Sequence, residues 1–336
     1  MRVVITKLNS LLYFFPIIRH NISCRKKLLL PLYKKKNNTL PLYHSDSKRK
    51  IVYMVINETT FSGGLSDRFR AMCAIYNECK KKGLDFRINF ETPQLNLFLV
   101  PNSYNWYISK DQICYDTATT YPCTLLTYHH SMNDKFQKFA QRTILKYYLS
   151  KPYNQIHIYS NMVGDNDLYS ELFHELFKPT HELQSYIDAH IENLGGKKNY
   201  IAVVFRFRQL LGDFKEGGET LSAKERDTYI NRCMKTIKLL HEEMADKHIL
   251  VTSDSITFLN TISSLPYVYV IPGNVVHIGF TFDAEKKTYM KSFVDYFVLS
   301  YASKVYLVRD KKMYHSGFAL RAALLNKAEY KEIKLK

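Results

Sequence analysis

The sequence predicts an α/β protein built on doubly wound parallel sheets. From residue 200 onward, short apolar strands alternate with amphipathic helices, a pattern typical of parallel sheets with helices on both faces. The strand at 200–205 is apolar throughout, as expected for a strand covered on both sides. A length of 336 residues fits two domains of ordinary size.

The first half predicts a β-loop-α-β unit followed by a tyrosine-rich middle. An apolar strand at Lys50–Ile56 leads through a turn-rich stretch to a helical pattern for which Ser66 is the expected N-cap and Gly83 the expected residue just past the end. The next strand covers Asp85–Phe90. In the middle region the pattern predicts helices at 135–149 and 167–177 only.

A second domain is expected after the linker-like stretch Leu194–Lys198, which holds two glycines and two lysines. Its long helix opens with the capping box Ser222–Glu225. We therefore expect a basic amino-terminal arm over 1–49, a first domain over 50–194 and a second over 195–336. After 200–205 the expected strands are 248–252, 267–271, 304–308 and 330–333, and the expected helices 255–263, 288–300 and 317–325.

The formal charge of +17 is concentrated at the amino terminus, where residues 1–50 hold twelve Lys and Arg and one acid, Asp46. Such a segment can meet an anionic membrane surface or nucleic acid. The apolar run Leu11–Ile18 is far shorter than the roughly 20 residues that span a bilayer, and it is a poor secretory signal. We expect a cytoplasmic protein that touches the inner face of the membrane through residues 1–50. Its six scattered cysteines predict reduced thiols.

Arg206 and Arg208 directly follow the apolar strand at 200–205, with Gly212 and Asp213 shortly after them. Ligands of open α/β sheets bind at the carboxyl ends of the strands. Arginine suits phosphate because its planar guanidinium can donate to two oxygens at once. The pattern therefore favours a phosphate-bearing substrate, the alternative being that both arginines pair with carboxylates at the sheet edge.

Three other strand-to-helix junctions carry small polar residues. Glycines before a helix let backbone amides approach a ligand, and the helix amino terminus favours phosphate. Short hydroxyl and carboxylate groups can bind the hydroxyls of a sugar or ribose. Ordinary turns and N-caps are the alternative at each junction. The residues are Gly63, Gly64, Asp67 and Arg68 at the first junction, Ser253, Asp254 and Ser255 at the second, and Ser316, Gly317 and Phe318 at the third.

Taken in order, these segments resemble the motifs of the fucosyltransferase superfamily that includes the α1,2-, α1,6- and protein O-fucosyltransferases. Gly63–Arg68 is similar to its Gly-Gly-Leu-x-Asp-Arg opening and Arg206–Asp213 to its His-x-Arg-Arg-Gly-Asp motif. Ser253–Ser255 is similar to its Thr/Ser-Asp-Asp/Ser motif, and Ser316–Phe318 to its carboxyl-terminal Ser-x-Phe motif. The order and spacing agree from about residue 50 to the end.

The resemblance implies a GT-B-like α/β fold, with two Rossmann-type doubly wound domains facing each other across a cleft. It implies that the second domain binds a nucleotide sugar: Arg208 would hold the β-phosphate of GDP-fucose, Asp254 and Ser255 would contact the nucleoside, and Ser316 and Gly317 would approach the pyrophosphate. The chain departs from the family in two places. Arg206 stands where the family usually has His, and Leu210 and Leu211 are extra residues before Gly212.

The expected activity is inverting transfer of fucose from GDP-fucose, or another nucleotide sugar, to a glycan or lipid-linked acceptor in surface polysaccharide or glycolipid synthesis. Arg208, Asp213 and Asp67 are the predicted catalytic residues, and His129 and His130 are further candidates for the general base. Asp165-Asn166-Asp167 spells the D-x-D of metal-dependent glycosyltransferases, and a metal site there is the alternative. Because the motif lies in a loop before a helix, where acids cap helix ends, no metal is expected, and no cofactor either. The alternatives are a basic nucleic-acid-binding protein, although no specific nucleic acid is expected, and a catalytically degenerate scaffold.

Overall fold

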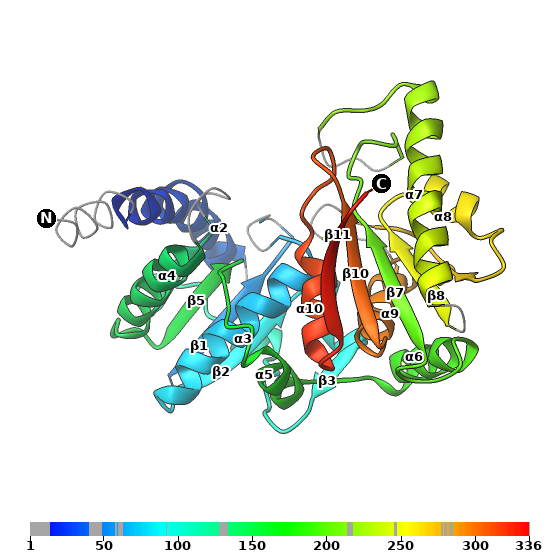
Figure 1. Cartoon of the computed structure of the whole chain (residues 1–336). Helices are drawn as coiled ribbons and strands as arrows, with labels where there is room; N and C mark the ends of the chain where they lie inside the picture. Colours follow the sequence, from blue (N-terminus) through cyan, green and yellow to red (C-terminus); the bar gives the residue numbers. More distant parts are fainter. Residues whose placement is uncertain are drawn as a thin grey trace, which may run out of the picture. The chain divides into compact units, whose positions relative to one another are not determined.

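The structure, a computed structural model of the whole chain, forms two compact units (Figure 1). The first unit comprises residues 1–95 and 101–178, and the second comprises 96–100 and 179–336. The structure describes residues 14–39, 49–57, 59, 63–91, 93–127, 134–213, 218–244, 247–276, 278, 281 and 285–335.

The first unit contains a four-stranded parallel sheet in the order β2-β1-β5-β4. Helix α3 (Leu65–Lys81) connects β1 to β2, and α4 (Asp134–Leu149) connects β4 to β5. Every residue of β1 is buried, as expected for a strand covered on both faces. The strands are β1 (Lys50–Val55), β2 (Asp85–Phe90), β4 (Thr120–Leu125) and β5 (Gln155–Ser160).

Short elements complete this unit. Helix α5 (Tyr169–Leu176) packs against α3, where Phe69 meets Phe173 edge-on at 5.0 Å between ring centroids. A two-stranded sheet pairs β3 (Leu99–Pro101) with β6 (Phe177–Pro179), in the segments through which the chain passes between the units. Two 3-10 turns, η2 (Leu95–Leu97) and η3 (Lys110–Gln112), lie in the connection from β2 to β4.

The described part of the amino-terminal arm is a helix packed on the first unit. Residues 14–24 are α-helical, η1 (Arg25–Leu29) is π-helical, and α2 (Leu30–Thr39) continues the helix. Asn21 accepts hydrogen bonds through Oδ1 from the Thr124 hydroxyl (2.9 Å) and the Leu126 amide (3.1 Å) on the edge strand β4 and the residue after it. This part of the expected basic arm over 1–49 therefore packs on the first unit and buries its apolar stripe against the sheet.

His157 on β5 joins this helix to the sheet core. Gln155 Oε1 accepts a hydrogen bond from the Cys114 amide. The same oxygen lies 2.8 Å from His157 Nε2, and because an amide oxygen can only accept, Nε2 carries the proton and donates it. His157 Nδ1 is left as the acceptor for the Tyr33 hydroxyl at 2.7 Å. The imidazole is fully buried and neutral in this network, and burial lowers its pKa from 6.5 to about 3.

Acid should therefore destabilise the first unit below pH 6.5. Between pH 6.5 and about 3 only the unfolded chain takes up the His157 proton, so stability falls as pH falls, by about 1.4 kcal/mol per pH unit from this group. Trp106, the single tryptophan of the chain, is buried in the first unit and reports its unfolding by fluorescence. Urea titrations at several pH values should give a shallower pH slope for His157→Gln than for the wild type, and equal slopes would contradict this assignment.

The second unit contains a five-stranded parallel sheet in the order β11-β10-β7-β8-β9. From the central strand β7 the chain winds outward through β8 and β9, then returns to the other side of β7 for β10 and β11, which makes the sheet doubly wound. The strands are β7 (Tyr200–Phe205), β8 (His248–Ser253), β9 (Val268–Tyr269), β10 (Lys304–Arg309) and β11 (Glu329–Lys334).

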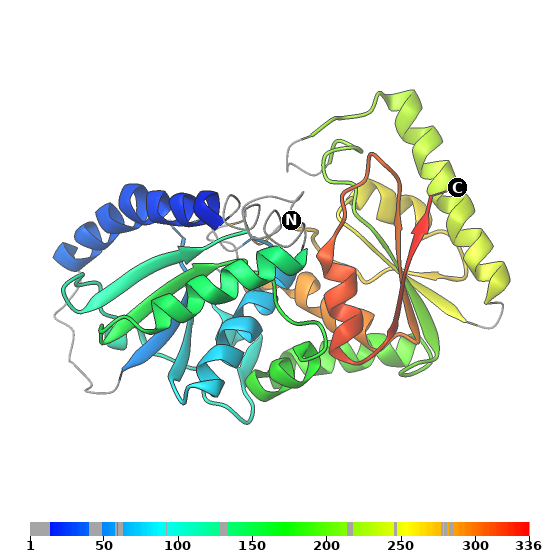
Figure 2. The same cartoon turned by 60° about the vertical axis from the view of Figure 1, so that its left-hand side comes forward.

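Helices cover both faces of this sheet (Figure 2). Alternate residues Ile201, Val203 and Phe205 of β7 pack in one core with apolar residues of α7 (Ala223–Glu243) and α8 (Ile256–Ile262). On the other face α9 (Lys286–Ser300) packs against both α6 (His181–Asn193) and α10 (Gly317–Leu325). This two-sided burial is what the apolar strand at 200–205 predicts.

Several expected boundaries differ from the structure. The second unit begins at Pro179 rather than at residue 195, because the unpredicted helix α6 packs on α9. Gly64, not Ser66, caps α3, since the helix begins one residue before Ser66. Strand β9 shortens to Val268–Tyr269. Gly83 does adopt a positive φ (61°) past the end of α3, and the Ser222–Glu225 capping box forms as expected.

Candidate functional site

The strand order of the second unit places its topological switch point between β7 and β10. The connection after β7 runs toward β8 on one side, and the connection after β10 runs toward β11 on the other. Such a divergence opens a crevice outside the carboxyl ends of the two strands. The last paired residues are Val308 with Phe205, between β10 and β7, and Phe205 with Ser253, between β7 and β8. The predicted site residues of this unit therefore lie at the carboxyl ends of three neighbouring strands, at one edge of the sheet.

Asp254 organises the first turn after β7. Its carboxylate accepts from Arg206 Nη1 (2.6 Å), from the Phe207 amide (2.8 Å) and from the Arg208 amide (2.6 Å). The side chain is almost fully buried; burial raises its pKa, and the Arg206 guanidinium and the backbone amides act against that rise. Arg206 and Asp254 thus form a buried pair, which is the alternative that the sequence left open for Arg206.

Arg208 is held differently from Arg206. Its φ of 56° lies in the left-handed region, which is costly for a residue with a side chain and recurs at functional sites. The hydrogen bond from its amide to Asp254 fixes this conformation, and its guanidinium carbon lies 5.1 Å from the ring centroid of Tyr314, in the loop after β10. The Tyr314 amide donates to the Arg206 carbonyl at 3.2 Å, so the loops after β7 and β10 are joined where Arg208 lies.

The two extra leucines belong to the core. Leu210 and Leu211 are buried in the cluster with α7 and α8, and Arg226 donates to the Leu211 carbonyl at 3.2 Å. Gly212 turns the chain with a φ of 85°. Asp213 then accepts through Oδ2 from the Ser255 hydroxyl (2.9 Å) and the Thr257 amide (2.7 Å) at the start of α8. Asp213 therefore stabilises the start of α8, and its role as a general base stays a prediction.

Ser253 and Ser255 make local bonds at the end of β8. The Ser253 hydroxyl accepts from the Ser255 amide at 3.1 Å, and the Ser255 hydroxyl accepts from the Phe258 amide at 3.1 Å. Ser255 is the N-cap of α8. The structure thus shows the capping role for Ser255, while its predicted contact with a nucleoside stays a prediction.

Ser316 and Gly317 begin α10 beside the switch point. The Ser316 hydroxyl accepts from the Phe318 amide at 3.3 Å, and the Phe318 ring packs edge-on to Tyr296 at 5.2 Å. A Cβ added to Gly317 would have no described atom within 4 Å. The start of α10 therefore has open space beside Gly317, and a helix amino terminus is a position that suits an anionic group.

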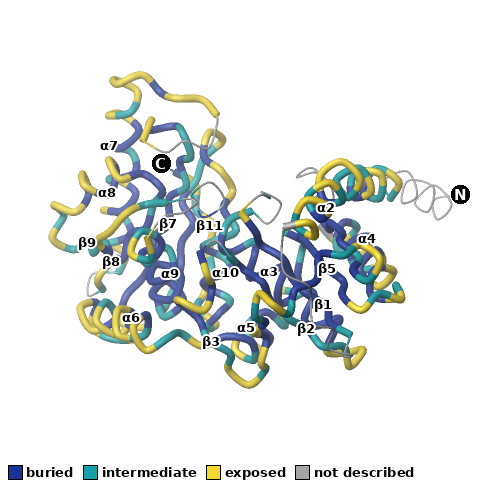
Figure 3. Tube along the Cα trace, turned by 180° about the vertical axis from the view of Figure 1, so that it is seen from behind, coloured by how far each residue is buried: buried dark blue, intermediate teal, exposed yellow. Residues whose placement is uncertain are grey.

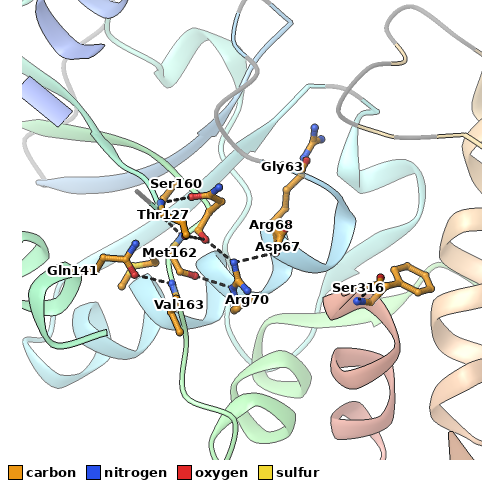
Figure 4. A network of polar contacts seen from close by, with 12 residues as sticks. Gly63, Asp67, Arg68, Arg70, Thr127, Gln141, Ser160, Met162, Val163 and Ser316 are labelled. Atoms are coloured by element: carbon orange, nitrogen blue, oxygen red, sulfur yellow. Dashed lines mark hydrogen bonds and ion pairs between the residues drawn. The ribbon is translucent and has the colours of Figure 1, made fainter. Parts of the chain in front are cut away.

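Gly63, Asp67 and Arg68 lie in the first unit, after β1 (Figure 4). Gly64, the N-cap of α3, belongs to the same turn. Gly63 has a φ of 67°, and a Cβ there would lie 3.0 Å from Asp67 Oδ2. Arg68 Nε donates to the Gly63 carbonyl at 2.9 Å, and its guanidinium carbon lies 4.8 Å from the centre of the Phe90 ring. The turn therefore needs glycine, and Arg68 is part of its framework.

Arg70, which the sequence did not single out, ties this turn to the end of β5. It pairs with Asp67 at 3.0 Å and donates to the Asn161 and Met162 carbonyls at 2.7 and 2.9 Å. Tyr314, two residues before Ser316, is a second residue to which the sequence assigned no role of its own. Both residues contact segments that are far away in the sequence, and such contacts leave no periodic signal.

The D-x-D sequence does not present a free carboxylate pair. Asp165 pairs with Lys138 (3.0 Å) and Arg142 (3.1 Å) on α4, and these hydrogen bonds, that from Lys138 first, lower its pKa. No group of three His, Cys, Asp or Glu residues within the described ranges could hold a metal ion. His129 and His130 lie outside the described residues.

Solved structures share this architecture. NodZ α-1,6-fucosyltransferase crystallised with GDP is 15% identical with a TM-score of 0.51, over 83% of this chain and 93% of that one; NodZ from Bradyrhizobium is 16% identical with the same score. A mutant of Arabidopsis thaliana FUT1 with GDP gives 13% identity and 0.52, over 95% and 79%. The chain has the fold of these fucosyltransferases.

This likeness confirms the predicted α/β fold with parallel sheets in both units. POFUT1 in complex with GDP is also similar, at 11% identity and a TM-score of 0.50, over 87% of this chain and 99% of that one. No protein-family model matches the sequence, and no curated protein matches it. Within the described residues, no helix is both long enough and apolar enough to span a bilayer.

Proposed function

We propose that the protein is a glycosyltransferase that transfers fucose from GDP-fucose to a glycan acceptor. The observation that carries the proposal is the contact of the Arg208 guanidinium with Tyr314, two residues before the N-cap of α10, at the switch point of a fucosyltransferase-like fold. NodZ, which shares this fold, was co-crystallised with GDP and soaked with GDP-fucose. A diphosphate bound between the loops after β7 and β10 would meet a guanidinium on one side and helix amides on the other.

This arrangement fits the electrostatic demands of the reaction. As the sugar leaves, negative charge builds on the diphosphate while the anomeric carbon becomes oxocarbenium-like. The Arg208 guanidinium and the amides at Ser316 and Gly317 would stabilise that charge without a metal or other cofactor. The transfer would be inverting, with Asp67 or Asp213 as the general base; Asp67 remains 37% exposed despite its pairing with Arg70.

The acceptor follows from the expected location of the protein. We place it in the cytoplasm at the inner face of the membrane, where lipid-linked glycans for surface polysaccharides and glycolipids are assembled. Support comes from the strongly basic first 50 residues and their attraction to anionic lipid. The first unit would bind the acceptor and the second unit the donor.

Nucleotide binding tests the proposal directly. GDP at about 100 times its dissociation constant should stabilise the fold by about 2.7 kcal/mol, seen as a rise in melting temperature that UDP and CDP do not match. GDP-fucose should be hydrolysed or transferred, and other nucleotide sugars should be poorer donors. A melting temperature that no nucleotide raises would instead favour a catalytically degenerate scaffold.

Gly317→Leu serves as the matched variant for this assay. The substitution enters open space, so the melting temperature without nucleotide should be unchanged or slightly higher. The leucine side chain would fill the open space beside the first turn of α10, so a diphosphate should no longer fit there and the stabilisation by GDP should be lost. Retention of the full GDP-induced shift would show that the diphosphate binds elsewhere.

A further inference from the structure

The amino-terminal helix is attached to the first unit along one stripe. Ile17, Asn21, Leu29 and Tyr33 are buried and lie at intervals of four or eight residues. In an α-helix a four-residue step rotates by about 40° away from a straight stripe. The π-helical segment η1 (Arg25–Leu29) has more residues per turn and corrects this drift, so the same face stays against the sheet from Ile17 to Tyr33.

Two cations of this helix take part in the attachment. Arg25 Nε donates to the Pro122 carbonyl at 2.9 Å, and the Arg25 guanidinium carbon lies 4.4 Å from the centre of the Tyr121 ring. Lys36 Nζ lies 5.4 Å from the centre of the Tyr115 ring. These contacts, with the Tyr33–His157 hydrogen bond, fix which side of the helix faces away from the unit.

The opposite side of the helix is basic and apolar together; we call it the outer face. Figure 3 shows the exposed turns of this segment around α2. Three large apolar side chains are exposed: Phe15 by 67%, Ile22 by 46% and Leu28 by 52%. Residues 14–39 contain no acid. The exposed cations of the outer face are Arg19, Lys26, Lys27, Lys34 and Lys35.

We propose that the outer face is a docking surface for an anionic lipid membrane. A helix that carries Lys and Arg beside exposed Phe and Leu lies in the interface, with the apolar side chains among the acyl chains and the cations at the headgroups. A nucleic-acid backbone would use the cations, but it offers no apolar environment for Phe15, Ile22 or Leu28. The surface depends only on the first unit and not on the identity of the sugar donor.

Vesicle binding by the full-length protein measures this surface. Sedimentation with phosphatidylcholine vesicles, with and without phosphatidylglycerol, should show binding only to the anionic vesicles. Each Lys near such a membrane contributes about 1 kcal/mol, so the triple variant Lys26→Glu, Lys27→Glu, Lys34→Glu should bind at least about 100-fold more weakly. The matched control Lys235→Glu, Lys238→Glu, Lys331→Glu changes the net charge equally at exposed positions of the second unit and should bind nearly as wild type.

The apolar residues provide the decisive comparison. Phe15→Ser, Ile22→Ser, Leu28→Ser keeps every charge, and it should abolish the part of the vesicle binding that survives high salt. Trp106 fluorescence melts check that each variant stays folded. The proposal is overturned if the wild-type protein does not bind anionic vesicles, or if the second-unit control loses as much affinity as the Lys26, Lys27, Lys34 variant. It is also overturned if the triple serine variant binds the vesicles with the same affinity as the wild type. Binding to duplex DNA that is equal in wild type and serine variant, without vesicle binding, would favour nucleic acid.

Discussion

Arg208→Ala should reduce transfer from GDP-fucose by about 100- to 1,000-fold, the usual loss when one preorganised donor to a developing anion is removed. The expectation follows from the position of the guanidinium, which lies over Tyr314 between the loops after β7 and β10. Steady-state kinetics should show most of the loss in kcat, because charge builds on the diphosphate in the transition state. Arg232→Ala, at a 41% exposed arginine on α7 of the same unit, is the control and should retain activity.

Arg208→Gly separates function from stability at the same position. Glycine adopts a φ of 56° without the steric cost of about 1–2 kcal/mol that a left-handed residue with a side chain carries. This variant should therefore be at least as stable as Arg208→Ala by thermal melting, yet equally inactive. An active Arg208→Gly or Arg208→Ala enzyme would remove Arg208 from the mechanism.

The sequence predicted the second unit well because its elements alternate regularly. Apolar strands and capping signals such as Ser222–Glu225 are local features, so they can be recognised without knowing the fold. The middle of the chain was harder. Strands β4 and β5 carry polar residues such as Thr124 and His157 that are buried through hydrogen bonds to the amino-terminal helix, and such long-range pairing leaves no periodic pattern.

For the candidate site too, one part could be predicted from the sequence and another could not. Its position at the ends of β7, β8 and β10 follows from sequence, because strand ends and helix starts are local signals. The roles of the residues within the site do not follow from the sequence. Arg206 and Arg208 are two residues apart, yet Arg206 pairs with the buried Asp254 while Arg208 lies beside Tyr314. The backbone of Arg208 has a positive φ, which directs its side chain differently from that of Arg206. The sequence gives no sign of a positive φ at a residue other than glycine.

Asp254→Ala should strongly destabilise the second unit. It would leave the Arg206 guanidinium, which is 15% exposed, without its carboxylate, and two backbone amides without their acceptor. Breaking a buried pair by removing one partner costs about 3–5 kcal/mol. Calorimetry should show the loss, and hydrogen exchange should locate it at the amides of β7 and β8.

A double-mutant cycle with Arg206→Ala distinguishes a structural pair from two independent residues. If Arg206 acts mainly through Asp254, the double variant should lose less stability than the sum of the single losses, by about 0.5–3 kcal/mol. The same cycle tests the site, because Asp254 also holds the strained backbone of Arg208. Asp254→Ala should therefore lower kcat even at temperatures where the variant is fully folded, whereas additive stability losses with unchanged kcat would contradict this role of Asp254 in positioning Arg208.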